Sequence, residues 1–89
     1  MAWTIDYTDT ARKRLRKLDK PTARRILDFM DARIAGRGNP RATGKALTGP
    51  RLGAYWRYRV GDYRILCDIQ DDAPRILVID IGNRREVYR

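Results

Sequence analysis

Two runs of alternating apolar and polar residues, 56–60 and 63–69, are separated only by Gly61-Asp62. A period of two is that of a β-strand with one buried face, and a Gly-X pair between two such runs is typical of a two-residue hairpin turn. The two runs therefore predict a β-hairpin whose register is set by its turn. In that register Arg59 lies directly opposite Arg64.

A third strand is expected after the hairpin. The run 75–81 is almost continuously apolar, as is typical of a central strand covered on both faces. The turn before it, 71–74, sets Tyr63 opposite Gly82, and Gly82 ends the strand. Alternation over residues 3–7 predicts a further short strand near the start of the chain.

Between these strands the apolar spacing changes to that of helices. Thr8 is a candidate N-cap for a first, basic helix, and Asp19 begins a second helix that stops near Gly36. Each helix has one apolar stripe, formed by Ala11, Leu15 and Leu18 in the first and by Ala23, Ile26, Leu27, Met30 and Ile34 in the second. Residues 38–53 are rich in glycine and positive charge and are predicted to be a loop. The order of elements predicts a single α+β domain over residues 1–89.

Composition limits the chemistry that such a domain can perform. The chain has 89 residues, a net charge of +9, one cysteine and no histidine. It therefore has no Ser-His-Asp or Cys-His nucleophile, no histidine-containing zinc site, no intramolecular disulfide and no CxxC motif. No apolar run approaches the length of a membrane span, about 18 residues, or resembles a secretory signal, so we expect a cytoplasmic protein without membrane contact. The positive charge favours nucleic acid or an acidic protein as the partner.

Three arginines of the hairpin share one face of the predicted sheet: Arg57, Arg59 and Arg64. Like charges opposite each other on a β-ladder destabilise it, and nothing in the fold requires three guanidinium groups there. A phosphate between them relieves the repulsion, because arginine binds phosphate through two parallel hydrogen bonds. The simpler explanation is that these arginines only keep an edge hairpin soluble.

The C-terminal segment adds to this face. Arg84, Arg85 and Tyr88 follow directly after the apolar strand, and the register brings Arg84 to the Arg64 end of the sheet. Together with the hairpin arginines they predict a site that binds a phosphodiester, stabilises the charge of its transition state and stacks on a base.

Other residues with reactive side chains receive lesser roles. Lys45 and Arg51, in the predicted loop, are candidate contacts to an RNA backbone. Cys67 is predicted to be a small buried hydrophobic residue. Asp71 and Asp72 are explained by a turn, so we expect neither a metal site nor a cofactor.

Two motifs and the apolar strand between them resemble the RelE toxins of the RelE/ParE superfamily of bacterial toxin–antitoxin pairs: 55–64 (YWRYRVGDYR) and 81–88 (IGNRREVY). The resemblance covers nearly the whole chain. It implies the RelE-like fold, in which an N-terminal strand and a two-helix hairpin pack on a curved antiparallel sheet. It also implies ribosome-dependent cleavage of mRNA, which inhibits translation. The implied partners are a RelB-like antitoxin that neutralises the toxin, and operator DNA bound by the toxin–antitoxin pair.

The same resemblance implies the catalytic residues, which are Arg57, Arg59, Arg64, Arg84 and Tyr88. The implied reaction is attack of the RNA 2′-OH on the adjacent phosphate, which leaves a cyclic phosphate and needs no metal. Many relatives carry lysine at one or both hairpin positions, whereas the arginines of this chain keep their proton at neutral pH. The general base is therefore left open among Tyr88, Glu86 and the ribosome. Two other functions also stay open: a ParE-like inhibitor of DNA gyrase without nuclease activity, and an RNA-binding module without activity.

Overall fold

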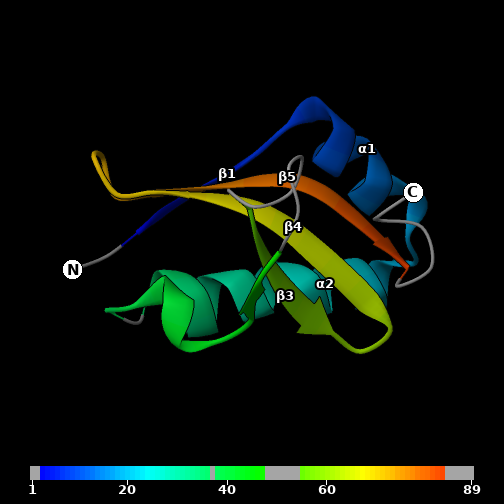
Figure 1. The fold of residues 1–89 in the computed structure, drawn as a ribbon. Helices are drawn as coiled ribbons and strands as arrows, with labels where there is room; N and C mark the ends of the chain where they lie inside the picture. Colours follow the sequence, from blue (N-terminus) through cyan, green and yellow to red (C-terminus); the bar gives the residue numbers. More distant parts are fainter. Residues whose placement is uncertain (1–2, 37, 48–54, 84–89) are drawn as a thin grey trace.

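The computed structural model describes residues 3–36, 38–47 and 55–83, which form a five-stranded sheet with the helices on one side (Figure 1). The strands are β1 (Thr4–Tyr7), β2 (Lys45–Ala46), β3 (Trp56–Val60), β4 (Tyr63–Gln70) and β5 (Arg75–Asn83), and their order in the sheet is β1-β5-β4-β3-β2. The predicted α+β fold is confirmed, and the sheet is antiparallel except for β1, which runs parallel to β5. A short turn joins only antiparallel strands, whereas the long connection after β1 allows a parallel pair.

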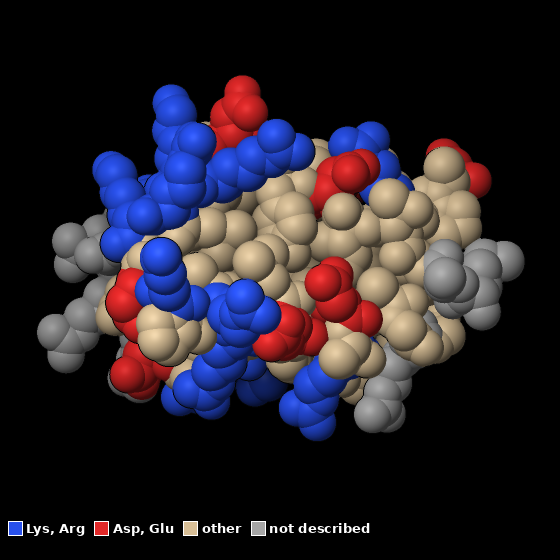
Figure 2. Space-filling view, turned by 180° about the vertical axis from the view of Figure 1, so that it is seen from behind, with Lys and Arg blue, Asp and Glu red and all other residues tan. Residues whose placement is uncertain are grey.

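The helices are α1 (Asp9–Lys17), α2 (Lys20–Phe29) and its π-helical continuation η1 (Met30–Ala35). As predicted, Thr8 and Asp19 cap them: Thr8 accepts a hydrogen bond from the Ala11 N–H at 3.1 Å, and Asp19 accepts one from the Thr22 N–H at 3.2 Å. The segment ends at Gly36, also as predicted. The exposed basic side chains of α1 gather at the upper left of Figure 2. No helix among the described residues combines the length and apolar character needed to cross a membrane.

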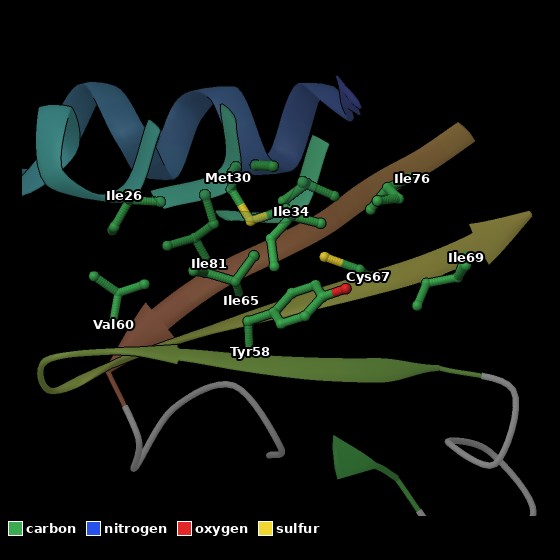
Figure 3. Packing of buried hydrophobic residues seen from close by; sticks show 12 residues of the cluster. Ile26, Met30, Ile34, Tyr58, Val60, Ile65, Cys67, Ile69, Ile76 and Ile81 are labelled. Carbon is green, nitrogen blue, oxygen red and sulfur yellow. The ribbon is translucent and has the colours of Figure 1, made fainter. Parts of the chain in front are cut away.

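The core lies between the helices and one face of the sheet (Figure 3). Its buried residues include Ile26, Met30 and Ile34 from the helical segment and Tyr58, Ile65, Cys67, Ile76, Val78 and Ile81 from the strands. The predicted burial of Cys67 is confirmed, and that burial raises the pKa of its thiol. The prediction that Leu27 belongs to the apolar stripe of the second helix is wrong, since its side chain is 37% exposed. The neighbouring Ile26 occupies the position on α2 that faces the core.

One extra residue in β5 changes the predicted register. Ile79 has no partner on β4, and beyond this β-bulge Tyr63 pairs with Asn83 rather than with Gly82. Because a bulge reverses the alternation of faces, Val78 and Ile81 are both buried in the core. The strand also continues to Asn83, past the end that the sequence predicts.

Both helices lie on one face of the sheet, so they cover only one face of β5. The prediction that β5 is buried on both faces is therefore only half right. Ile76 points to the helices and is fully buried, whereas Leu77 points to the opposite face and is half-buried. That opposite face is the one to which the hairpin arginines belong, since Tyr58 and Ile65 of β3 and β4 point to the core.

The segment predicted as a loop, 38–53, contains two short elements. Residues Pro40–Ala42 form a 3-10 turn (η2), and β2 pairs with β3 in antiparallel register. A strand of two residues shows no alternation, so the sequence pattern does not reveal it. Residues 48–53 of this segment lie outside the described residues.

Candidate active site

The hairpin brings its three arginines to the sheet face opposite the helices, which we call the arginine face. Val60 pairs with Tyr63 across a turn in which Gly61 has φ +60°, and Arg59 lies opposite Arg64. The predicted register is therefore confirmed. Arg57 is two residues from Arg59 along β3 and so points to the same face.

The second strand adds a lysine to this face. Lys45 is the partner of Arg57 in the pairing of β2 with β3, so the two side chains lie side by side. A pocket of about 220 Å³ opens here, and its lining residues are Gly44, Lys45, Arg57 and Arg59. Among the described residues, no carboxylate lines this pocket and no ion pair involves its lysine or its two arginines. The pocket therefore suits an anion.

Side-chain hydrogen bonds hold the segment before β2 against β3. The Trp56 indole N–H donates to the Thr43 carbonyl oxygen at 2.7 Å, and the buried Tyr58 hydroxyl donates to the Pro40 carbonyl oxygen at 2.6 Å. Burial of Tyr58 raises the pKa of its hydroxyl, which keeps it a proton donor in this bond. Between these contacts Gly44 has φ +88° and lies so close to β3 that a side chain would not fit. These contacts position Lys45 beside Arg57.

Four predicted site residues lie outside the described residues: Arg51, Arg84, Arg85 and Tyr88. The last described residue of β5, Asn83, pairs with Tyr63, and Arg64 pairs with Gly82. The described part of β5 therefore ends beside Arg64, and the predicted position of Arg84 at this end of the sheet lies outside the described residues.

Two acidic residues at the end of β4, Asp68 and Asp71, form hydrogen bonds within the fold. Arg41 donates two hydrogen bonds of 2.9 Å to Asp71, which hold the pKa of that carboxyl below its usual range. Asp68 accepts a hydrogen bond from Gln70. Within residues 3–36, 38–47 and 55–83, no group of three or more histidine, cysteine, aspartate or glutamate side chains is arranged to hold a metal ion.

Comparison with known proteins identifies the family. The sequence model of the protein family described as "ParE toxin of type II toxin-antitoxin system, parDE" matches residues 5–88 of this chain. The chain belongs to this toxin family. Toxin RelG of Mycobacterium tuberculosis is 28% identical over 89 residues, which are 100% of this chain and 99% of RelG. The membership in the RelE/ParE superfamily expected from the sequence is confirmed, and the protein is the toxin of a type II toxin–antitoxin system.

Solved structures similar to this toxin come from the same kind of system. The toxin–antitoxin complex RelBE2 of M. tuberculosis matches with a TM-score of 0.84 and 26% identity, over 94% of this chain and 100% of that chain. The archaeal RelE–RelB complex of Pyrococcus horikoshii matches with a TM-score of 0.75 and 25% identity, over 98% of this chain and 100% of that chain. The isolated Escherichia coli RelE toxin, at 21% identity and a TM-score of 0.71, supports the fold alone.

Two features of the toxin's pocket escape the sequence pattern. The sequence predicts Lys45 as a contact to an RNA backbone, and the structure adds that Lys45 pairs with Arg57 and lines the pocket. Gly44 is indistinguishable in the sequence from the other glycines of its segment, and only its contacts with β3 reveal its structural role.

Proposed function

We propose that this toxin is a metal-independent endoribonuclease that cleaves mRNA on the ribosome and thereby inhibits translation in the cytoplasm. The observation that carries the proposal is the pocket on the arginine face, which Lys45, Arg57 and Arg59 line and to which no carboxylate of the described residues belongs. Opposed cations destabilise a β-ladder, so these cations are better explained by an anionic substrate than by the needs of the fold.

The proposed reaction is an internal displacement at phosphorus. The RNA 2′-oxygen loses its proton and bonds to the adjacent phosphorus, while the bond from phosphorus to the 5′-oxygen breaks and that oxygen takes up a proton. The products are a 2′,3′-cyclic phosphate and a 5′-hydroxyl. The phosphorane in between carries extra negative charge, which Arg57, Arg59 and Arg64 neutralise from fixed positions. Arg84 or Tyr88 assists the leaving oxygen, and Arg51 and Arg85 bind the RNA backbone.

Lys45 is the candidate general base of this pocket. An arginine keeps its proton at physiological pH, whereas a lysine can release and take up a proton. The pairing of Lys45 with Arg57 supports this role, since it puts the lysine beside the cations that would hold the phosphate. Lys45→Arg keeps a cation at this position, so it should bind RNA better than Lys45→Ala but cleave it no faster.

The proposed partners follow from the reaction and from the relatives. The substrate is mRNA on the ribosome, and the similar solved structures that contain RelB support a RelB-like antitoxin as the neutralising partner. Operator DNA is bound through the toxin–antitoxin complex. No cofactor enters the proposed reaction.

The decisive experiment uses ribosomes programmed with a defined mRNA. The toxin should produce new ends in the A-site codon, with cyclic phosphates. At the Mg²⁺ concentration that keeps ribosomes intact, added Mn²⁺ or Zn²⁺ should not raise the rate. Arg59→Gln should slow cleavage about 100-fold, the effect of removing one group that stabilises transition-state charge. Arg12→Gln is the matched control, because it removes one exposed charge from α1. Intact A-site codons at high toxin excess contradict the proposal.

A second candidate function is ParE-like inhibition of DNA gyrase without nuclease activity. The match of residues 5–88 to the ParE toxin family favours it. It predicts gyrase-dependent DNA breaks, and it predicts that Arg59→Gln is as toxic as the parent protein.

A further inference from the structure

Two guanidinium groups meet at the β3–β4 turn. The Arg59 Nε donates to the Gly61 carbonyl oxygen at 3.3 Å. A Cβ placed on Gly61 would lie 3.3 Å from a terminal nitrogen of Arg25, so the Arg25 guanidinium, which comes from α2, also lies against this residue. The helix layer and the hairpin therefore each contribute a cation to the same turn.

These cations belong to a groove between α2 and the edge of β3. The groove has a volume of about 340 Å³, and its lining residues are Arg25, Asp28, Phe29, Ala32, Arg33, Arg59, Val60 and Gly61. The Arg33 guanidinium carbon lies 5.9 Å from the centre of the Phe29 ring. The groove thus combines an apolar, partly aromatic lining with three arginines.

The three arginines of the groove lack carboxylate partners within the described residues. Asp28 also lines the groove, but it forms no ion pair with Arg25, Arg33 or Arg59. Other arginines of the protein are paired, in Arg14–Asp80, Arg41–Asp71 and Arg75–Asp6. Three neighbouring cations and one carboxylate leave the described lining of the groove with an excess of positive charge, which favours an anion supplied from outside.

The groove lies next to the pocket of the arginine face, because the two share a lining residue. Arg59 lines both. Within the described residues, β2 pairs with Arg57 and Trp56 alone, so β3 forms the edge of the described sheet beyond them. In a hairpin closed by a two-residue turn, the backbone N–H and C=O of Val60 form hydrogen bonds with Tyr63 of β4. Because hydrogen-bonded and non-hydrogen-bonded pairs alternate, the backbone N–H and C=O of Arg59 point away from β4, toward that edge. A chain of phosphates that follows this edge from the pocket therefore reaches the groove by way of Arg59, whose backbone N–H faces it.

We propose that this groove binds the RNA backbone that flanks the scissile phosphodiester, with Arg25 and Arg33 each neutralising one phosphate. The choice of RNA as substrate rests on the proposed function. A polymer with one negative charge in every unit matches a line of cations that runs from Lys45 to Arg33, and the Phe29 ring offers a surface for a base. Arg25 and Arg33 act as positioning residues, since they lie outside the pocket of the reaction.

The test measures binding of 2′-O-methyl RNA, which cannot be cleaved, to the full chain by fluorescence anisotropy. The groove variant is Arg25→Gln/Arg33→Gln. The control variant, Arg12→Gln/Arg16→Gln, removes two equally exposed charges from α1. Loss of two phosphate contacts should lower the slope of log K against log salt by about 1.4 and weaken binding of an eight-nucleotide RNA about 20-fold at 0.1 M salt. The control variant should lose less than about threefold, because it changes only the net charge.

Two further measurements vary the length of the RNA and the charge of the groove. Binding of a dinucleotide, which fills only the pocket, should not distinguish the groove variant from the control, and Arg25→Lys/Arg33→Lys should restore most of the salt slope. The inference is overturned by equal losses in the groove and control variants, by absence of RNA binding to the parent protein, or by a groove variant that loses binding of an acidic peptide but not of RNA. Groove-dependent RNA binding without cleavage on ribosomes would refute the proposed reaction and leave the groove assignment intact.

Discussion

Gly44→Ala should detach β2 from β3 and so separate Lys45 from Arg57. Gly44 has φ +88°, where residues with a Cβ are strained. A Cβ at this position would overlap the Arg57 carbonyl oxygen and lie 2.6 Å from the Trp56 indole nitrogen. A carbonyl within a paired strand cannot move aside, so the segment around residue 44 must shift away from β3.

The cost follows from the contacts that this shift breaks. The unfavourable φ costs about 1–2 kcal/mol. Loss of the 2.7 Å hydrogen bond from Trp56 to Thr43 costs a further amount of about 1 kcal/mol. The free energy of unfolding should therefore fall by about 2–3 kcal/mol, which in a domain of this size lowers the Tm by about 10–20 °C.

Urea unfolding followed by tryptophan fluorescence measures this loss, since Trp56 reports on the affected contact. Gly38→Ala is the matched control, because a Cβ on Gly38 meets nothing within 4 Å and its φ is not in the left-handed region. If the two variants unfold at the same urea concentration, the role assigned to Gly44 is refuted. A Gly44→Ala protein that keeps the full cleavage rate on ribosomes would further show that Lys45 need not lie beside Arg57.

Two further predictions concern stability. Tyr58→Phe leaves the buried Pro40 carbonyl without its 2.6 Å hydrogen bond, so the free energy of unfolding measured in urea should fall by about 1–3 kcal/mol; a loss no larger than that of Tyr63→Phe would contradict this account. Arg41 lowers the pKa of Asp71 from its ordinary value of 3.8, so the ion pair stabilises the fold above that value and ceases to do so as the pH falls through the lowered pKa. The urea midpoint of Asp71→Asn should accordingly lie below that of the parent protein at pH 7 and approach it in acid. A gap that stays constant or widens toward low pH would mean that Asp71 acts by some other means.

The sequence by itself determined the features that depend on neighbouring residues. The Gly61-Asp62 turn sets the pairing of Arg59 with Arg64, because a two-residue connection allows one register. Thr8 and Asp19 specify the starts of α1 and α2, because an N-cap needs only a side-chain oxygen next to the first free N–H groups. The candidate arginine face could therefore be predicted before the structure was known.

The tertiary structure alone decided the features that depend on contacts between distant segments. The bulge at Ile79 shifts the register by one residue, because burial of both Val78 and Ile81 requires it, and no turn signal encodes this. The pairing of Lys45 with Arg57 depends on the close approach of Gly44 to β3. The position of Arg25 at the same turn as Arg59 depends on how α2 packs beside the hairpin. Local patterns encode turns and caps, whereas such pairings arise from the packing of the whole core. The sequence therefore determined which cations line the hairpin, and the tertiary structure decided which others join them.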